Sequence, residues 1–260
     1  MVNNAIYSYK LFDEYWKPLN QSFYNVARLS LRFAKMHYKT ILYCDDQTKE
    51  AFDKEGLVFD EYRIRNEWFV DVNRATSGKP KIYAAADQTE PYVLLDLDTL
   101  IFSKLFSNNC ITYGFGEANN TEDYDADYVE TNYKVPFEKM KDRIDIKLKW
   151  GIYPNNSVVL VNNPTIMRMA CEKVIDIMQG NFSLTTAMFY EQFLLYNYLV
   201  HYQTPIGFFY KSPPVYLENE KMNYLNVLSK QFAHLGEYKR PREQEVIKRL
   251  QDFLDKKSKL

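Results

Sequence analysis

The segment from residue 92 to 102 constrains the fold of this chain more than any other part of its 260 residues. It reads Tyr-Val-Leu-Leu-Asp-Leu-Asp-Thr-Leu-Ile-Phe, and its apolar start, without Gly or Pro, predicts a strand buried on both faces. Asp96 and Asp98 come where such a strand should end. Residues two apart on an extended chain point to one side, so both carboxylates can face one hard cation. Open α/β sheets bind ligands beyond the carboxyl ends of their strands, so we expect a metal-bound diphosphate there.

An Asp-x-Asp triplet by itself is a weak signal, because about one is expected by chance in a chain of this length. Two more overlap at Asp123, Asp125 and Asp127. No predicted strand precedes them, so we interpret that polar segment as a solvated acidic loop. For Asp96 and Asp98 the plain alternative is a strand-end turn with exposed acids.

Composition restricts the class of protein. Apolar residues make up 46% and charged residues 26%, which predicts a globular chain, and the net charge of -1 gives no overall attraction to nucleic acid or anionic membrane. Three cysteines are too few for a disulfide framework or a zinc cluster, so we expect a reducing compartment. Neither a signal peptide nor a membrane-spanning apolar run is visible, and a cytoplasmic location is expected. The 8 glycines form no phosphate-binding glycine loop.

Strand-like and helix-like segments alternate along the first half of the chain. Strands are predicted at 5–9, 40–44, 57–64 and 92–97, and helices at 22–37, 48–54 and 81–88. Such alternation is typical of a parallel, doubly wound α/β sheet. Later strands or extended segments are predicted at 110–115, 157–161, 204–210 and 215–217, with helices at 137–145, 164–178, 183–198, 219–230 and 241–256. We expect one domain, with a nucleotide-binding half to about residue 115, an acceptor half over about 116–240, and a C-terminal helix over 241–260.

The predicted C-terminal helix is amphipathic. Its apolar positions are Val246, Ile247, Leu250, Phe253 and Leu254, and most of its other side chains are charged, with Lys and Arg in excess. This pattern permits two interpretations. The helix can rest on a membrane surface and bring the chain to a lipid-linked glycan, or it can pack on the domain with a solvated basic face.

A late segment strengthens the interpretation of Asp96 and Asp98. Residues 232–241 read Phe-Ala-His-Leu-Gly-Glu-Tyr-Lys-Arg-Pro. The imidazole of His234 can complete an oxygen-rich Mn²⁺ site, and Lys239 can neutralise a diphosphate as a point charge. Taken alone, His234 would be interpreted as an ordinary surface or core histidine.

A hydrophobic strand that ends in Asp-x-Asp, with a late His-Gly-Lys-Pro-like motif, resembles the GT-A nucleotide-sugar glycosyltransferases, most of all glycosyltransferase family eight. The resemblance implies a Rossmann-like, mostly parallel mixed sheet flanked by helices. It implies Mn²⁺ or Mg²⁺ held by Asp96, Asp98 and His234, with Asp96 and Lys239 near the phosphates of a nucleoside diphosphate sugar. The His-Leu-Gly spacing is one residue shorter than the family's His-x-x-Gly, which makes Arg240 an alternative to Lys239.

Five more positions match the family by resemblance. Lys81 corresponds to a basic residue that reaches the phosphates or the donor sugar, and its alternative is a solvated lysine. Asn156 corresponds to an Asn beside the donor sugar, and Tyr7 and Ser8 to residues that contact the base. Glu191 would lie near the anomeric carbon. A buried acid on an apolar helix is also costly unless it is paired, which makes Glu191 a functional candidate on physical grounds, the alternative being a structural hydrogen bond.

These implications predict transfer of a sugar, from UDP or another nucleoside diphosphate, to an acceptor hydroxyl with retention of configuration. Polysaccharide, lipid-linked glycan, protein and modified DNA all remain open as acceptors. Two alternatives use the same residues. The Asp-Leu-Asp-Thr string also resembles the haloacid-dehalogenase phosphatases, with Asp96 as nucleophile, although it lacks their Gly and comes late in the chain. A non-catalytic module that binds a sugar nucleotide or a cation is the other.

Overall fold

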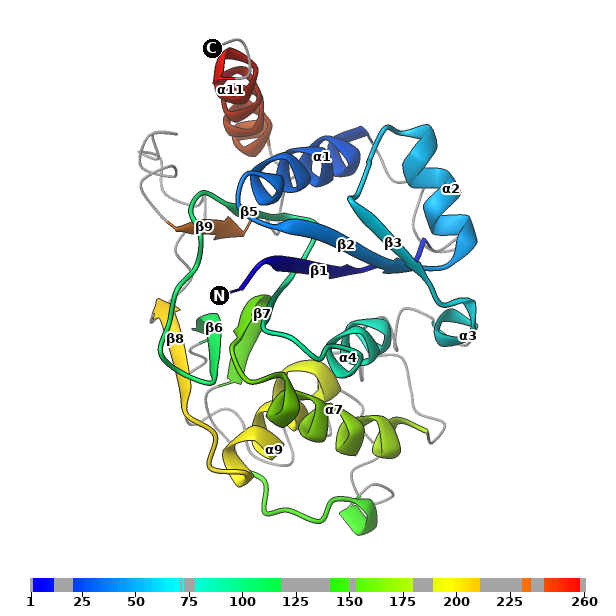
Figure 1. Ribbon diagram of the computed structural model, residues 1–260, viewed down its shortest axis with the longest axis vertical. Helices are drawn as coiled ribbons and strands as arrows, with labels where there is room; N and C mark the ends of the chain where they lie inside the picture. Colours follow the sequence, from blue (N-terminus) through cyan, green and yellow to red (C-terminus); the bar gives the residue numbers. More distant parts are fainter. Residues whose placement is uncertain are drawn as a thin grey trace.

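A seven-stranded sheet runs through the described part of the molecule (Figure 1). The computed structural model describes residues 2–11, 21–70, 72, 78–117, 141–149, 153–179, 189–210, 231–234 and 241–257. The strand order is β3-β2-β1-β4-β7-β6-β8. In chain order the strands are β1 (Asn4–Ser8), β2 (Lys39–Cys44), β3 (Glu61–Ile64), β4 (Tyr92–Leu95), β6 (Ile111–Glu117), β7 (Tyr153–Val161) and β8 (Ile206–Tyr210).

One strand of this sheet runs against the others. The pairs β1–β2, β1–β4, β2–β3 and β6–β8 are parallel, whereas β7 is antiparallel to both of its neighbours, β4 and β6. The predicted fold class is therefore confirmed: an α/β protein with a mostly parallel mixed sheet, as in Rossmann-like GT-A folds. Because β7 is reversed, its first residues lie at the edge of the sheet where β1 and β4 end.

Helices cover both faces of the sheet. On one face α1 (Gln21–Lys35) and α2 (Asp46–Lys54) pack over Ala5, Tyr7 and Val93, and on the other α4 (Lys79–Ala86) and α7 (Pro164–Met178) pack over Ile6 and Leu94. The second face also carries the π-helical turn η3 (Phe189–Leu194) and α9 (Leu195–His201), and α3 (Asn66–Phe69) precedes α4. Successive residues of the central strands thus point to opposite faces of the sheet and are buried under different helices. Each large apolar side chain buried in this way contributes about 1.5–3 kcal/mol to the stability of the fold.

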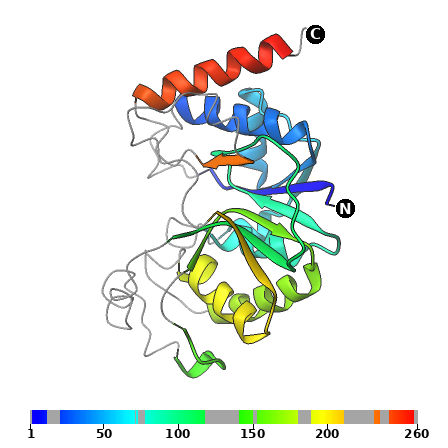
Figure 2. The same ribbon diagram turned by 90° about the vertical axis from the view of Figure 1, so that its left-hand side faces the viewer.

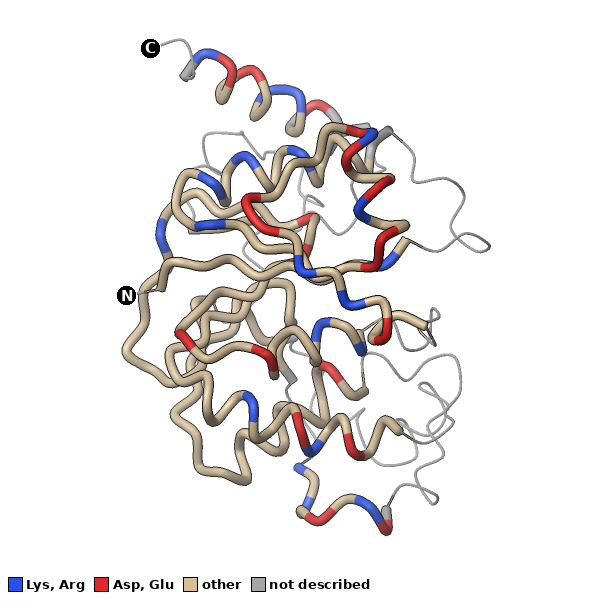
Figure 3. The backbone as a smooth tube through the Cα atoms, turned by 45° about the vertical axis from the view of Figure 1, so that its right-hand side comes forward, with Lys and Arg blue, Asp and Glu red and all other residues tan. Residues whose placement is uncertain are grey.

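Helix starts follow the local sequence signals. The Asp45 side chain accepts a hydrogen bond from Thr48 N at 2.8 Å and caps α2, and the Asn163 side chain accepts from Ile166 N and caps α7. Proline occupies the first turn of α4 and of α7, where its missing N–H has no cost. Basic and acidic residues are interspersed along the described backbone (Figure 3).

A second, two-stranded sheet joins distant parts of the sequence. Strand β5 (Thr99–Ile101) pairs antiparallel with β9 (Phe232–His234), and the backbone of His234 lies opposite Thr99. The hydroxyl of Ser30, on α1, donates to the Thr99 carbonyl and ties this ribbon to the helix layer. Backbone pairing therefore places the backbone of His234 opposite Thr99, the residue that follows Asp98.

Helix α11 (Pro241–Lys257) packs along α1 (Figure 2). Its Ile247, Leu250 and Leu254 are buried, and they pack against apolar side chains of α1 and against Leu100 of β5. Arg32 of α1 bonds Asp255 at 2.7 Å. Of the two interpretations of this helix, packing on the domain is the one the structure shows. None of the helices in the described part of the chain combines the length and the hydrophobicity that a membrane span requires.

Some predicted boundaries are wrong. Strand β3 begins at Glu61, although 57–60 was expected to belong to it, because the ladder with β2 starts only at Ile41 opposite Glu61. Leu57 and Phe59 are buried but lie in the preceding loop, so their apolar character reflects packing and not strand pairing. Within the predicted helix 137–145 the described residues form one 3₁₀ turn, Lys141–Arg143. The predicted segments 215–217 and 219–230, and the acidic pairs at Asp123–Asp127, lie outside the described residues.

Candidate functional site

A cleft of about 240 Å³ opens where β1 and β4 end and β7 begins. Its walls come from the end of β1, the start of α4, the turn after β4, the start of β7 and the turn η3. The lining residues are Ser8, Tyr9, Gly78, Lys81, Asp96, Asn155, Asn156, Ser157, Glu191 and Gln192. Four of the predicted site residues, Ser8, Lys81, Asn156 and Glu191, are thus brought together with Asp96 in one cavity.

The strand tip carries Asp96 into the cleft as expected. β4 ends at Leu95, and Asp96 N donates to the Ser157 carbonyl at 3.0 Å while its own carbonyl accepts from Thr99 N at 3.1 Å. These bonds fix the turn that separates β4 from β5. The Asp96 side chain is 39% exposed, so it is open to a ligand.

Lys81 lies at the centre of the site. Among the residues with described side chains it is the only charged one that is buried, with 7% of its surface exposed. Its ammonium donates to Asp96 Oδ1 at 2.7 Å and Glu191 Oε1 at 2.7 Å, and to the Asn156 carbonyl at 2.6 Å. Burial lowers the pKa of Lys81, but the two carboxylates outweigh burial and leave that pKa above its usual value. An ammonium has three hydrogens to donate, so all three are used inside the protein.

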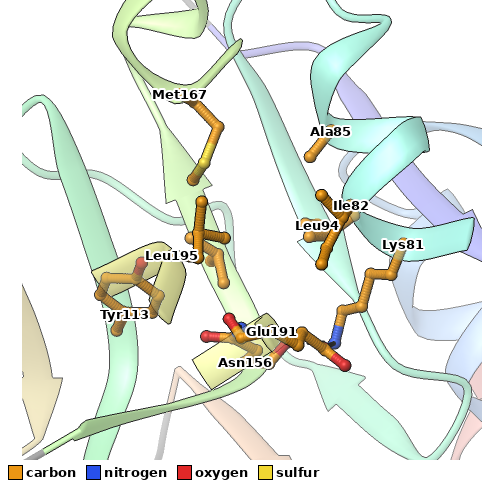
Figure 4. A pocket seen from close by; sticks show the side chains of 10 residues that line it. Lys81, Ile82, Ala85, Leu94, Tyr113, Asn156, Met167, Glu191 and Leu195 are labelled. Carbon is orange, nitrogen blue, oxygen red and sulfur yellow. Dashed lines mark hydrogen bonds and ion pairs between the residues drawn. The ribbon is translucent and has the colours of Figure 1, made fainter. Parts of the chain in front are cut away.

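Glu191 reaches the cleft from the π-helical turn η3. Such turns interrupt the regular helix ladder and are frequent at functional sites. Its neighbours Tyr190 and Phe193 are buried in the core, while the Glu191 side chain is 17% exposed and points to Lys81 (Figure 4). The Asn156 amide donates to the Glu191 backbone carbonyl and so joins β7 to this turn.

The pKa of Glu191 is raised above its ordinary value of 4.5. Burial is the largest cause and the charge of Asp96 adds to it, whereas Lys81 and the Asn156 side chain oppose the shift. The folded protein therefore holds a proton on Glu191 at pH values where the unfolded chain has released it.

Stability is expected to fall with rising pH because of this group. The native state binds more protons than the unfolded state above about pH 4.5, so the Glu191 contribution to the free energy of unfolding decreases as pH rises through the native pKa. We expect the stability of the wild-type protein relative to Glu191→Gln to decline across that window in urea titrations. A difference that stays constant or grows with pH would contradict the raised pKa.

Four of the eight buried side-chain polar atoms that lack a hydrogen-bond partner in the described part of the chain belong to residues that line the same cleft. They are Ser8 Oγ, Asn156 Oδ1, Ser157 Oγ and Gln192 Oε1. Native proteins leave few buried polar atoms unpaired, so a group of four facing one cavity indicates a surface for a polar ligand. Together with the carboxylates of Asp96 and Glu191, the wall is rich in acceptors and suits a ligand with several hydroxyl groups.

Two sequence predictions place residues differently from the structure. Lys81 was expected to reach the phosphates or the donor sugar, but its three hydrogens are donated to Asp96, Glu191 and Asn156, so in this structure it holds the site together. Tyr7 was expected to contact the base. Its side chain is fully buried against Phe59, with ring centroids 5.4 Å apart, because residue 7 points to the opposite face of the sheet from Ser8.

The predicted metal ligands are only partly described. Asp98 follows Asp96 in the turn before β5, and β9 places the His234 backbone opposite Thr99. The side chain of His234 and all of Lys239 and Arg240 lie outside the described residues. Among the described residues no group of three or more His, Cys, Asp and Glu side chains is arranged to hold a metal ion. The ligand set that includes His234 stays a prediction.

Several lining residues were missed by the sequence analysis. Asn155, Ser157 and Gln192 all face the cleft beside residues that were predicted. The sequence signal for Asn155 and Ser157 is the polar Asn-Asn-Ser triplet at the start of an apolar strand. This triplet indicates a site only once β7 is known to be antiparallel to β4. Its first residues then lie beside the end of β4, where Asp96 N bonds the Ser157 carbonyl.

Comparisons with known proteins leave the family open. No protein-family model and no curated protein matches the chain. Crystal structures similar to it include HddC from Yersinia pseudotuberculosis, with TM-score 0.45 and 11% identity over 97% of this chain and 100% of that chain. Another is the apo-form glycosyltransferase GlyE in Streptococcus pneumoniae TIGR4, with TM-score 0.39 and 13% identity over 79% of this chain and 45% of that one. A third is 4-diphosphocytidyl-2C-methyl-D-erythritol synthase from Anaerococcus prevotii DSM 20548, with TM-score 0.41 and 9% identity over 88% and 95%. These scores are too low to carry a functional conclusion, and membership of glycosyltransferase family eight stays a prediction.

Proposed function

We propose that this chain is a metal-dependent glycosyltransferase that moves a sugar from a nucleoside diphosphate, in the first instance UDP, to an acceptor hydroxyl. The observation that carries the proposal is the cleft at the end of β4. There Asp96, from the end of a buried strand, and Glu191 line a space with room for a monosaccharide, together with residues whose hydroxyl and amide oxygens have no partner among the described residues. A site of this kind at the carboxyl edge of an α/β sheet is where such folds bind ligands.

The charge balance of the site supports metal dependence. Among the described residues that line the cleft, the two acids Asp96 and Glu191 are accompanied by one cation, Lys81. A diphosphate would add negative charge to an already acidic site, so it needs a divalent ion to approach. Asp96 and Asp98, with His234 from the paired strand β9, have the oxygen and imidazole donors that Mn²⁺ accepts. When bound, the ion would stabilise the charge that builds on the departing diphosphate.

The chain's own residues then bind and orient the donor. Ser8, Asn156, Ser157 and Gln192 would hydrogen-bond the hydroxyls of the sugar, which pairs their free polar atoms. Lys81 would hold Glu191 toward the cleft, beside the reacting carbon. Lys239 or Arg240 would meet the phosphates, since Lys81 has no donor left for them. We retain UDP-sugars as donors, with a neutral sugar favoured by the acceptor-rich wall.

A thermal-shift screen tests this function. UDP at about a hundred times its Kd is expected to raise the Tm by about 5 °C or more when Mn²⁺ is present, and not when it is absent. Other nucleoside diphosphates serve as controls for the base. Release of UDP from UDP-glucose would then separate a transferase from a module that binds without turnover. The absence of a metal-dependent shift with every nucleotide would overturn the proposal.

A further inference from the structure

The Lys81 ammonium lies in a shell of oxygen atoms that come from three separate parts of the fold. Its nitrogen is 2.7 Å from Asp96 Oδ1, after β4, 2.7 Å from Glu191 Oε1, on η3, and 2.6 Å from the Asn156 carbonyl oxygen, on β7. Two of these oxygens belong to carboxyl groups. Hard cations prefer ligands of this kind, so the ammonium fills a place that would otherwise attract a cation from solution.

This arrangement is held by the surrounding fold and is not a loose surface contact. Lys81 is buried in the first turn of α4, and that helix packs against both β1 and η3. Figure 4 shows its side chain reaching from α4 toward Glu191. The Glu191 side chain is 17% exposed and that of Asp96 is 39% exposed, so Asp96 is the more open of the two acids to a ligand in the cleft.

We propose that Lys81 is the internal counter-ion of the empty site, and that it keeps a divalent ion off Asp96 until a nucleoside diphosphate is present. Asp96 belongs to the metal-binding set of the proposed function, and one of its oxygens already accepts from the ammonium. A divalent ion on the same carboxylate is repelled by that ammonium, and the repulsion is weakly screened because Lys81 is buried. Diphosphate oxygens add both negative charge and further ligands, which outweigh the repulsion.

The consequence is coupled binding of metal and nucleotide. Each strengthens the binding of the other, and by linkage the factor is the same in both directions, so it can be measured from the metal side alone. This coupling rests on the proposed function. The exclusion of a divalent ion by Lys81 does not, since it depends only on the oxygen shell that the ammonium fills.

Mn²⁺ titrations followed by electron paramagnetic resonance of the free ion test the inference, because they count bound metal without turnover. For the wild type we expect Mn²⁺ alone to bind at least about tenfold more weakly than Mn²⁺ in the presence of UDP, after correction for Mn²⁺ held by UDP in solution. Lys81→Met is expected to bind Mn²⁺ alone at least about tenfold more tightly than the wild type. If this variant does not fold, Lys81→Met combined with Glu191→Gln gives the same comparison.

Three controls make the result specific. Glu191→Gln leaves the ammonium on Asp96, and Lys79→Met removes a neighbouring lysine that lies outside the oxygen shell, so neither should tighten the binding of Mn²⁺ alone. Asp96→Asn added to the Lys81 variant should abolish the gain. Unchanged affinity for Mn²⁺ alone in a folded Lys81 variant would overturn the inference. A wild type that binds no Mn²⁺ with any nucleoside diphosphate would overturn the proposed function, while the comparison with the Lys81 variant still decides whether Lys81 excludes the ion.

Discussion

Replacing Lys81 with Met is expected to lower the free energy of unfolding by about 3–5 kcal/mol, because it leaves a buried carboxyl group without its ion-pair partner. Glu191 is largely buried and loses the ammonium at 2.7 Å, and Asp96 and the Asn156 carbonyl lose the same donor. Equilibrium unfolding in urea by circular dichroism measures the change. Removing a cation that only binds substrate would leave stability nearly unaltered.

Two further variants make this result specific. Lys79→Met removes a lysine from the same helix turn that forms no ion pair with the described residues and contacts the Tyr83 ring at 5.8 Å. This change should alter stability by less than about 0.5 kcal/mol. Lys81→Met combined with Glu191→Gln should recover part of the loss, because the amide is far less costly to bury alone. Equal losses in the Lys79 and Lys81 variants would contradict the ion-pair role.

The role of Lys81 shows what the sequence could and could not reveal. Its helix was predicted because 81–88 follows a Ser-Gly-Lys-Pro turn, and α4 indeed begins there. Its partners are 15 and 110 residues away, Asp96 and Glu191, and come together only when α4, the turn after β4 and η3 pack on one another. Sequence patterns report periodicity within an element, not which side chains meet between elements. The lysine was therefore assigned to a ligand that the structure leaves it no donor to bind.

The fold could be predicted from the sequence more completely than the contacts within the site. The central strands are buried on both faces, so their apolar runs stand out, and β1, β2, β4 and β7 were all predicted within a few residues. The antiparallel direction of β7 has no local signal, because direction is set by the connection and not by side chains. The π-helical form of η3 is likewise not coded by periodicity, although Glu191 was noted as an acid on an apolar segment.

Asp98→Asn is expected to remove the Mn²⁺-dependent stabilisation by UDP and to lower kcat for sugar transfer by at least about a hundredfold. The change removes one negative oxygen from the predicted ligand set but leaves the three acceptors of Lys81 in place, so the fold should persist. Thermal shifts with UDP, with and without Mn²⁺, measure binding separately from turnover.

The chain supplies its own control for this prediction. Asp125 belongs to the other Asp-x-Asp pairs, which lie outside the described residues and follow no predicted strand. Asp125→Asn makes the same chemical change in the same short pattern, and it should leave both the metal-dependent shift and kcat intact. If Asp125→Asn abolished the shift and Asp98→Asn did not, the metal would belong to the acidic segment. The pairing of β5 with β9, which places His234 beside the strand-tip acids, would then have a structural role alone.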